Sequence, residues 1–423
     1  MNFIKTIVLS GISTIIKLLS LLVINKIVAV YIGPSGIAII GQFQNLLKII
    51  TTFGNGAINN GVTKYVAEYN GVDETKKNDV IRAAIIITII FSFLVGLITF
   101  IGSSYFSLWI LKTNDYHLII KLLGITLILI SFNTIFLSII NGYKKIKLLV
   151  FINIVSSLLS LIITSLLTIK YGIFGALLSL VVVQSIILFV TFPLVYKKIE
   201  FRFSLKNVEK SHYRNLLAYS LMALISISIG SLSQILIRNH IIDQLSIEEA
   251  GYWQSVWMIS SMYLMVFSIA FSTYYLPKLS ELQTHEELKK EIMSGYKIIL
   301  PLVFISAAGI YILRDFIISH LFTSEFSAMR FLFAFQLIGD FLKMASFSLA
   351  YLMVSKAMIK TYIVTEIIFS MSFYILTIVF VSIRGLEGVT HAYALNYLLY
   401  LVTMVILFKR IIFNKKETLN VND

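Results

Sequence analysis

The sequence predicts an all-α, polytopic membrane protein whose twelve transmembrane helices form two pseudo-symmetric six-helix lobes. Hydrophobic residues make up 58% of the 423 residues, charged residues make up 13%, and the mean hydropathy is +0.90. Such a chain has too little polar surface to cover a soluble globule of this size. Its apolar residues fall into segments of about 20, the length that crosses roughly 30 Å of hydrocarbon, and one motif occurs in both halves of the chain.

Short polar joints separate the predicted spans. The first apolar segment, 7–30, is too long for the core of a signal peptide, and no small-residue cleavage site follows it, so we interpret it as a retained span. In chain order the predicted spans are 8–30, 38–62, 83–103, 118–140, 149–168, 173–195, 215–237, 251–276, 297–319, 328–353, 361–382 and 388–408.

A motif in the first half has a looser counterpart in the second half. GPSGIAIIGQFQNLLKIITTFGNGAINNGVTKYVAEY, residues 33–69, begins with a Gly-Pro turn and corresponds to EEAGYWQSVWMISSMYLMVFSIAFSTYYLPKLSEL, residues 248–282. The matching positions are Gly36, Lys64 and Glu68 in the first copy and Gly251, Lys278 and Glu281 in the second. An even number of spans in each half makes this a parallel repeat, with a cleft expected between two bundles.

The longest polar joint divides the chain into these halves. We predict an N-terminal six-helix lobe over 1–196, a cytoplasmic inter-lobe linker over 197–214, and a C-terminal six-helix lobe over 215–423 that ends in a short cytoplasmic tail.

Basic residues indicate the orientation of the chain. If the N-terminus is cytoplasmic, 24 Lys and Arg residues lie in the joints on that side and six lie in the joints on the other side. Because basic residues concentrate on the cytoplasmic side, both termini are predicted to be cytoplasmic. The net charge of +14 is mostly this asymmetry. It indicates attraction to anionic membrane lipids, and no nucleic-acid partner is expected.

Several chemistries are not supported by the residues present. The chain has no cysteine, and its six histidines are scattered without metal-ligand spacing. Neither a disulfide nor a metal site is therefore expected. A GxxxxGK[ST] phosphate loop is also missing from the sequence, which argues against an ATP-driven pump acting by itself. No cofactor is predicted.

Four ionisable residues lie about ten or more residues from the nearest predicted end of their spans: Lys17, Lys48, Asp340 and Lys343. Each costs roughly 2.5–3.5 kcal/mol at a helix centre, so each is a candidate functional residue. Lys26 lies nearer a span end and on the opposite side of the helix from Lys17, about 180° round the axis. The two lysines therefore cannot face one cavity on a straight helix. We therefore favour Lys17.

Two carboxylates are candidates for ion coupling. Asp340 and Lys343 are spaced i, i+3 on one helix face, where they either neutralise each other or take part in function. Glu366, in the first turns of the eleventh span, is either a solvated residue at the inner mouth or a proton site. Counting charges at depth predicts a mildly cationic cavity, and lysine is suited to passing a phosphate along a path.

Uncharged residues complete the predicted cavity. The candidate glycan contacts are Gln42, Asn45, Asn59, Asn60, Gln254, Trp253 and Trp257. The two tryptophans are spaced i, i+4 and fit either stacking on sugar rings or an aromatic belt at the membrane interface, of which the belt is commoner. The segment GNGAINNG, residues 54–61, is a candidate hinge because glycine weakens a helix. Its glycines are Gly54, Gly56 and Gly61.

Several strings together resemble one branch of transporters: GPSGIAIIGQFQNLL, NNGVTKYVAEY, AGYWQSVWMIS, LRDFIISHLFTSEFSAMR and FQLIGDFLKMASF. They are similar to the Wzx-type flippases of the multidrug/oligosaccharidyl-lipid/polysaccharide (MOP) exporter superfamily. Within it they are most similar to O-antigen translocases and enterobacterial common antigen lipid III flippases, and the likeness runs nearly end to end. The central cationic cavity of that family maps onto Lys17 and, less directly, onto Lys26, Asp340 and Lys343, whereas Lys48 rests on its depth alone.

The resemblance implies a MATE-like fold, alternating access and no enzymatic activity. The implied cargo is an undecaprenyl-diphosphate-linked oligosaccharide, an O-antigen unit or lipid III, moved from the cytoplasmic to the periplasmic leaflet of a bacterial inner membrane. Implied partners are membrane lipids, a polysaccharide polymerase and a chain-length regulator.

Two other classes remain open. A drug/cation antiporter of the same fold would carry excess carboxylates in its cavity, whereas this chain carries excess lysine. An integral-membrane glycosyltransferase or polymerase would use acid/base groups and often a large outer loop, whereas the outer joints here are short.

Overall fold

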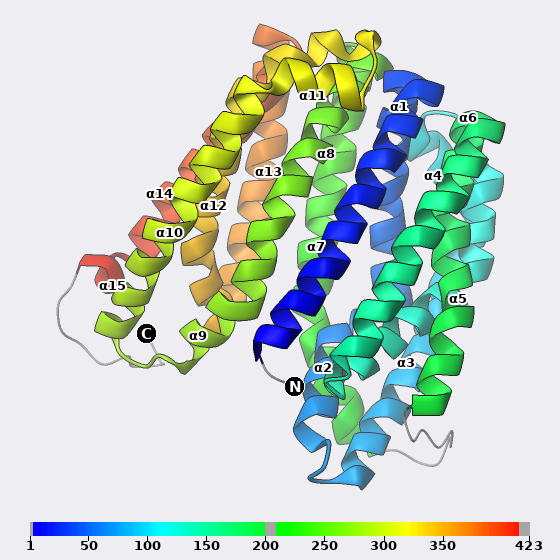
Figure 1. Cartoon of the computed structure of the whole chain (residues 1–423), viewed down its shortest axis with the longest axis vertical. Helices are drawn as coiled ribbons and strands as arrows, with labels where there is room; N and C mark the ends of the chain where they lie inside the picture. Colours follow the sequence, from blue (N-terminus) through cyan, green and yellow to red (C-terminus); the bar gives the residue numbers. More distant parts are fainter. Residues whose placement is uncertain (1–2, 199–208, 414–423) are drawn as a thin grey trace. The chain divides into compact units, whose positions relative to one another are not determined.

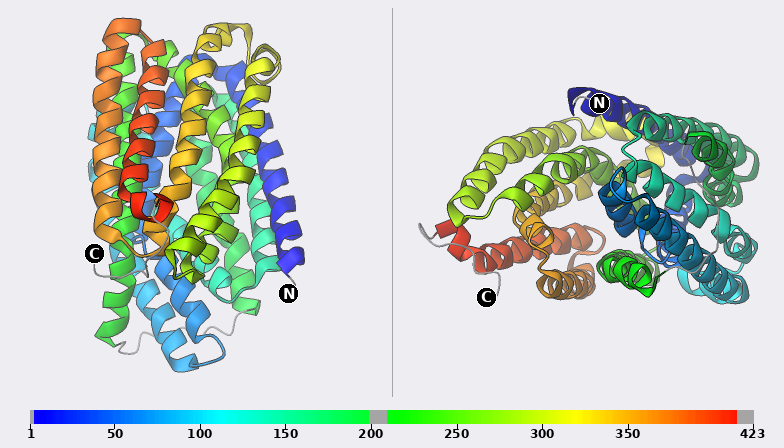
Figure 2. Two further views of the ribbon diagram at one scale, coloured as in Figure 1. Left: turned by 90° about the vertical axis from the view of Figure 1, so that its left-hand side faces the viewer. Right: turned by 90° about the horizontal axis from the view of Figure 1, so that it is seen from below.

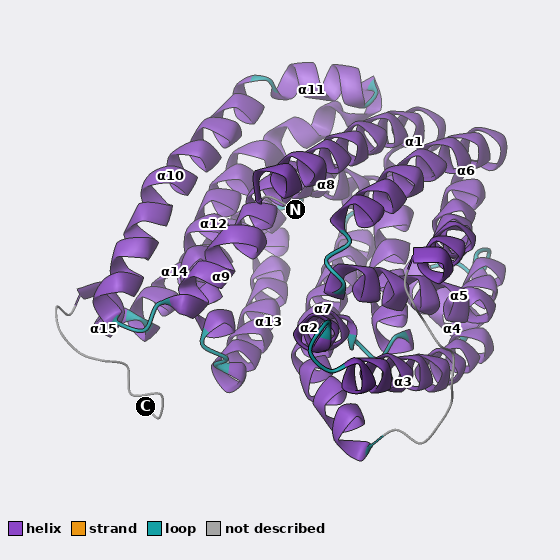
Figure 3. Cartoon of the chain, turned by 60° about the horizontal axis from the view of Figure 1, so that its bottom comes forward, coloured by secondary structure: helices purple, strands orange, loops and turns teal. Residues whose placement is uncertain are grey.

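The computed structural model describes residues 3–198 and 209–413, and in both ranges the regular structure is helical throughout (Figures 1 and 3). Within these ranges no β-strand occurs, which confirms the all-α prediction. The chain forms two compact units, Met1–Ile235 and Leu236–Asp423.

Unit 1 contains seven helices, counting the first part of the last one. They are α1 (Phe3–Gly54), α2 (Asn59–Tyr69), α3 (Glu74–Ile101), α4 (Ser103–Leu111), α5 (His117–Gly142), α6 (Ile146–Lys198) and most of α7 (Lys210–Gln244). The predicted linker, 197–214, falls mostly on residues outside the described ranges. The predicted lobe boundary there stays a prediction, while the contacts of unit 1 extend along α7 to Ile235.

Unit 2 contains the rest of α7 and the remaining helices. They are α8 (Ile247–Ala270), a π-helix at Phe271–Tyr275, α9 (Leu276–Glu281), α10 (His285–Ile312), α11 (Arg314–Leu321), a 3-10 helix at Ser324–Leu332, α12 (Phe333–Ser355), α13 (Ile359–Arg384), α14 (Glu387–Leu407) and α15 (Lys409–Phe413). Figure 2 shows α13 and α14, in orange and red, running side by side.

The described residues include ten helices that are long and apolar enough to cross a membrane. Two of them, α1 and α6, are each interrupted by one glycine with non-helical backbone angles: Gly33 with φ 63° and Gly172 with φ 56°. Each of these long helices therefore consists of two helical segments. The ten candidates are thus consistent with the twelve predicted spans.

Three helical hairpins turn on glycine pairs with the same spacing, G-x-x-G. The pairs are Gly33 and Gly36, Gly172 and Gly175, and Gly385 and Gly388. The first glycine of each pair has a φ between 56° and 63°, in the left-handed region that other residues rarely adopt. The second allows close approach: a Cβ on Gly175 would lie 1.9 Å from the Leu167 carbonyl oxygen. The same turn thus occurs in both units, at 172–175 and at 385–388.

The α3 and α5 helices of unit 1 cross at two glycines. A Cβ on Gly96 would lie 2.6 Å from the Gly124 carbonyl oxygen, and a Cβ on Gly124 would lie 2.7 Å from the Gly96 carbonyl oxygen. The Phe100 backbone nitrogen is 2.9 Å from that second position. Because the contacts are between backbones, only glycine fits at either position.

The predicted hinge at 54–61 is a packed break between α1 and α2. Asn55 Oδ1 accepts a hydrogen bond of 2.8 Å from the Ala57 N–H, and Gly56 has a φ of 64°. A Cβ on Gly54 would lie 2.9 Å from Leu127, and Gly61 is buried on α2. Alanine at 54 or 56 would therefore add clashes or strain besides any change in motion, and a hinge role for this segment stays a proposal.

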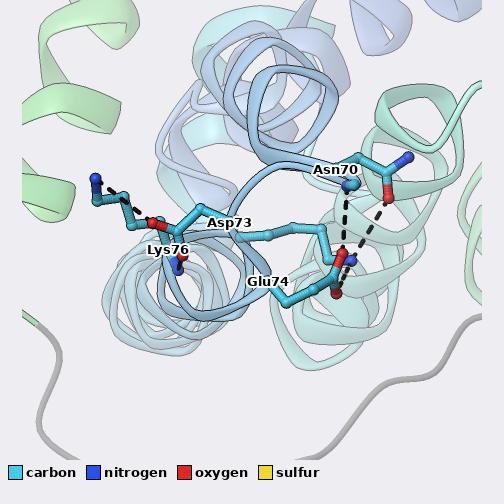
Figure 4. Close-up of polar contacts among 6 residues, drawn as sticks. Asn70, Asp73, Glu74 and Lys76 are labelled. Atoms are coloured by element: carbon cyan, nitrogen blue, oxygen red, sulfur yellow. Dashed lines mark hydrogen bonds and ion pairs between the residues drawn. The ribbon is translucent and has the colours of Figure 1, made fainter.

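The joint between α2 and α3 is held by charged side chains (Figure 4). Lys77 is 4% exposed, forms an ion pair with Glu74, and places its ammonium 4.7 Å from the Tyr143 ring centroid. Asp73 caps α3: its Oδ1 accepts a hydrogen bond of 3.0 Å from the Lys76 N–H. The Lys76 ammonium lies 3.5 Å from Oδ2 of the same carboxylate. The predicted basic joint is thus ordered by local acid partners.

Acidification is expected to weaken the α3 cap. The backbone hydrogen bond from Lys76, and secondarily its charge, hold the pKa of Asp73 below the ordinary value of 3.8. Since the folded pKa is depressed, this stabilisation is present above the unfolded-state pKa and is lost as the pH falls through the folded pKa. Asp73→Asn keeps a capping oxygen without the charge. We expect the difference in thermal midpoint between wild type and Asp73→Asn to shrink between about pH 5 and pH 3. A constant difference would contradict this account.

The core of unit 2 is formed by buried residues of α8, the π-helix, α9, α10, α12, α14 and α15. Buried residues from the π-helix, α10, α12 and α14 pack together, including Phe271, Ile292, Leu352 and Met404. Thr284 and Glu287 form a reciprocal capping box at the start of α10. This framework fixes α8, α12 and α14 against one another, and those three helices carry the candidate site.

Candidate functional site

A cavity of about 310 Å³ lies inside unit 2, between α8, α12 and α14. Its polar lining includes Ser260 and Ser261 from α8, and Asp340 and Lys343 from α12. Trp257 and Tyr393 supply aromatic walls. Ser261 is exposed, so the cavity is open at this edge.

Asp340 is fully buried and is held by two tyrosines. The Tyr263 hydroxyl donates to Oδ2 at 2.9 Å, and the Tyr393 hydroxyl donates to Oδ1 at 2.9 Å. The Gln336 amide nitrogen lies 3.5 Å from Oδ1. A buried carboxylate needs such donors because burial without hydrogen bonds is costly. The donors come from α8, α14 and α12, so this one group ties three helices together.

Gly339 makes room for one of these tyrosines. A Cβ at this position would lie 2.3 Å from Tyr393 Cδ1 and 2.6 Å from its Cε1. The absence of a side chain at Gly339 therefore allows the Tyr393 ring to lie against α12, where its hydroxyl reaches Asp340. Gly339 is a positioning residue.

Lys343 lies among aromatic rings. Its ammonium is 5.4 Å from the Trp257 ring centroid, 5.6 Å from that of Phe347 and 5.5 Å from that of Tyr397. Such cation–π contacts stabilise a desolvated cation. Lys343 forms no ion pair among the described residues; Asp340 and Glu366 act on it through longer-range electrostatic attraction. The i, i+3 spacing of Asp340 and Lys343 thus leads to two separate sets of partners, and the direct local pair that the sequence suggested is not formed.

The structure separates the two tryptophans that were candidate glycan contacts. Trp257 lines the cavity, whereas Trp253 is fully buried, with the Arg238 guanidinium 5.4 Å from its ring centroid. Gln254 is also buried and accepts a hydrogen bond from Arg238. A belt position is therefore wrong for Trp253, and its ring and the Gln254 side chain are enclosed by protein in this structure.

The remaining candidates belong to unit 1. Gln42 is 1% exposed, and its Nε2 donates to the Ile235 carbonyl oxygen at 3.3 Å. Asn45 is buried, Asn59 is half-buried, and Asn60 is exposed. The lysines Lys17 and Lys48 are exposed, and Lys26 is half-buried. The structure thus brings Trp257, Asp340 and Lys343 together in one cavity, with Glu366 in electrostatic range, and leaves the unit 1 candidates outside that group.

No cluster of three or more His, Cys, Asp or Glu side chains able to hold a metal occurs in the described ranges. Sequence reasoning missed the two tyrosines and Gly339. Tyr263 is separated from Asp340 by 77 residues and Tyr393 by 53, and no spacing rule connects them. The one available signal was Gly339 itself, a glycine directly before a deep aspartate.

Comparison with known proteins agrees with this architecture. The chain is 29% identical to the lipid III flippase of Escherichia coli K12 over 414 residues, covering 95% of this chain and 96% of that protein, and the lipid III flippase of Shigella flexneri matches equally. By structure it is similar to the lipid II flippase MurJ in its inward closed conformation, with a TM-score of 0.74, 16% identity, and coverage of 96% of this chain and 87% of the other.

An outward-facing multidrug resistance MATE family transporter of the MOP superfamily has the same fold, with a TM-score of 0.73, 15% identity, and coverage of 96% of this chain and 95% of the other. These structural likenesses confirm the predicted MATE-like fold. A family described as polysaccharide biosynthesis protein matches residues 4–283. The chain therefore belongs to the polysaccharide biosynthesis protein family, as its resemblance to the Wzx-type flippases predicted.

Proposed function

We propose that this protein is a flippase for undecaprenyl-diphosphate-linked oligosaccharides, an O-antigen unit or lipid III, and not an enzyme. It moves its cargo from the cytoplasmic to the periplasmic leaflet of a bacterial inner membrane by alternating access. The single observation that carries this proposal is the end-to-end correspondence with a lipid III flippase, over 95% of one chain and 96% of the other.

The chemistry of the candidate residues supports the same cargo. A phosphate carried through hydrocarbon without partners would pay a large desolvation cost. Lys17, Lys48 and Lys26 in unit 1 and Lys343 in unit 2 supply cations at membrane depth. Gln42, Asn45, Asn59 and Asn60 supply amide donors and acceptors for a glycan, and the Trp257 ring offers an apolar face to a sugar.

Orientation and partners follow from the same proposal. The distribution of basic residues favours cytoplasmic N- and C-termini. A polysaccharide polymerase and a chain-length regulator are the expected partners, because a glycan delivered to the outer leaflet must next be extended there.

The membrane potential favours export of this cargo. A potential of 100 mV, inside negative, is worth about 2.3 kcal/mol per charge moved. A diphosphate with two negative charges therefore moves outward downhill by roughly 4.6 kcal/mol.

The test is flipping of a fluorescent polyprenyl-diphosphate-linked oligosaccharide in proteoliposomes, with the potential and a pH gradient imposed separately. We expect Lys17→Ala and Lys48→Ala each to slow flipping by about tenfold or more, because a hydrogen bond to a charged group is worth about 1.5–3 kcal/mol. Lys170→Ala is the matched control, since Lys170 is an exposed lysine whose ammonium lies 5.2 Å from the Tyr171 ring centroid.

A wild-type protein that leaves the labelled lipid in its original leaflet would refute the flippase. A polymerase would instead lengthen the glycan, and an antiporter would move a cationic dye. If flipping occurs but both unit 1 variants match Lys170→Ala, the lysine assignment in unit 1 is wrong and the flippase stands.

A further inference from the structure

The cavity of unit 2 presents a cation that forms no ion pair with any carboxylate in the described part of the chain. The Lys343 ammonium is surrounded by three rings at 5.4–5.6 Å, and no ion pair engages it among the described residues. Rings stabilise the charge but do not neutralise it. The Ser261 hydroxyl lines the same cavity at its open edge and is able to donate to a ligand. An ammonium and a hydroxyl can both donate hydrogen bonds to an oxyanion, and the ammonium also supplies the opposite charge.

Two carboxylates nevertheless act on this cation from a distance. Asp340 and Glu366 attract Lys343 electrostatically, so one positive charge is opposed by as many as two negative charges, of which only that of Asp340 lies in the cavity lining. An anion that reaches Lys343 would be repelled by both carboxylates. Binding becomes favourable when one of them loses its charge, and the one that lines the cavity is Asp340.

Asp340 has hydrogen-bond partners suited to either protonation state. As a carboxylate it accepts from the Tyr263 and Tyr393 hydroxyls. Gln336 is fully buried, and its Oε1 has no hydrogen-bond partner among the residues that the structure describes, while its Nε2 lies 3.5 Å from Asp340 Oδ1. Rotating this amide by 180° exchanges its nitrogen and oxygen. The freed oxygen would then accept the O–H of a neutral Asp340, so the unpartnered acceptor beside the acid gains a partner.

We propose that Lys343 forms an oxyanion site whose occupation is accompanied by protonation of Asp340. The ligand is a phosphate or carboxylate group of the lipid-linked glycan, so this inference rests on the proposed function. On binding, one proton is taken up from water and one O–H bond forms on the Asp340 carboxylate. Asp340 and Lys343 lie on α12 and act on each other electrostatically. The other titratable groups that act on them are Tyr263 on α8, Glu366 on α13, and Tyr393 and Tyr397 on α14.

The test measures ligand binding and proton uptake together on the purified full-length protein. Three probes are used: inorganic pyrophosphate for the carrier phosphates, glucuronate for an acidic sugar, and glucose as the neutral partner of glucuronate. Binding is followed by calorimetry, and proton uptake by a pH-indicator dye in weak buffer at about pH 7. Glucuronate stays ionised there, so any proton taken up with it goes to the protein.

We expect saturable binding of at least one anion, no binding of glucose, and measurable proton uptake that does not exceed one proton per anion. Asp340→Asn should bind the anion at least tenfold more tightly at about pH 8 and take up no proton. Lys343→Met should lose binding by more than tenfold, and Lys343→Arg should retain it. Lys170→Met is the matched control. Glu366→Gln tests which carboxylate takes up the proton. If this variant abolishes proton uptake and Asp340→Asn does not, the proton goes to Glu366 and the proposal fails.

The other possible outcomes identify the bound group or overturn the inference. Pyrophosphate binding alone assigns the site to the carrier phosphates, and glucuronate binding alone assigns it to the glycan. Binding without proton uptake, equal binding by Lys343→Met, or no anion binding by a wild type that flips its lipid would each overturn the inference while the flippase stands. A wild type that binds the anion with linked uptake but does not flip would refute the proposed function and leave the site.

Discussion

Replacing Gly339 with valine is expected to slow flipping about ten- to a hundredfold while leaving the protein in the membrane. The new Cβ would lie 2.3 Å from the Tyr393 ring, so the ring must move off α12 and its hydroxyl must leave Asp340. A hydrogen bond to a charged group is worth about 1.5–3 kcal/mol, and each 1.36 kcal/mol is a factor of ten in rate. Initial rates in proteoliposomes, at equal protein content, measure the effect.

Two further variants separate site geometry from general overpacking. Gly309→Val is the matched control, because a Cβ at this position in α10 meets no atom within 4 Å in the ranges that the structure describes. Tyr393→Phe removes the hydroxyl without adding volume and should reproduce most of the loss. If Gly339→Val slows flipping and Tyr393→Phe does not, the bond to Asp340 is unimportant and overpacking is the cause.

Replacing Gly124 with leucine is expected to prevent unit 1 from folding stably. The Cβ would lie 2.7 Å from the Gly96 carbonyl oxygen and 2.9 Å from the Phe100 nitrogen. Backbone atoms cannot rotate away as a side chain does, so α3 and α5 must separate along their length. We expect a loss of about 3 kcal/mol or more, at the upper end of overpacking costs. The thermal midpoint and the yield of monodisperse detergent-solubilised protein report it.

Gly11→Leu provides the comparison for this substitution. A Cβ at Gly11 in α1 meets no atom of the described residues within 4 Å, so the added volume meets none of them at that point. Its midpoint should stay close to that of wild type. If Gly124→Leu has the same thermal midpoint as Gly11→Leu, the glycine crossing between α3 and α5 contributes little to the stability of the protein.

Hydropathy predicted the helices well because the bilayer imposes one length on every span. The predicted span 361–382 corresponds to α13, Ile359–Arg384, and 388–408 corresponds to α14, Glu387–Leu407. The predicted boundaries are wrong where a helix is shorter than a membrane span or ends inside one. Residues 59–62 were joined to the second span, whereas Gly56 and Ala57 have positive φ and α2 begins at Asn59. The short helices α4 and α11 were absorbed into joints and span ends.

The candidate site was predictable only in its charged members. Depth alone identified Asp340 and Lys343, because a charge far from a span end is costly wherever it points. Their partners were not predictable, since Tyr263 and Tyr393 are two of 22 tyrosines and reach Asp340 only through the packing of α8 and α14 on α12. Spacing along one helix indicated an ion pair, but packing gave Lys343 three rings instead.

The glycine-paired hairpins bear on how the protein is made. At 33–36, 172–175 and 385–388 the chain reverses at a single left-handed residue, so only a few residues separate the two arms. Each pair of arms satisfies its backbone hydrogen bonds within its own helices. We therefore expect the insertion machinery to carry only one short bend across per pair, so that the two arms of each pair enter the lipid together.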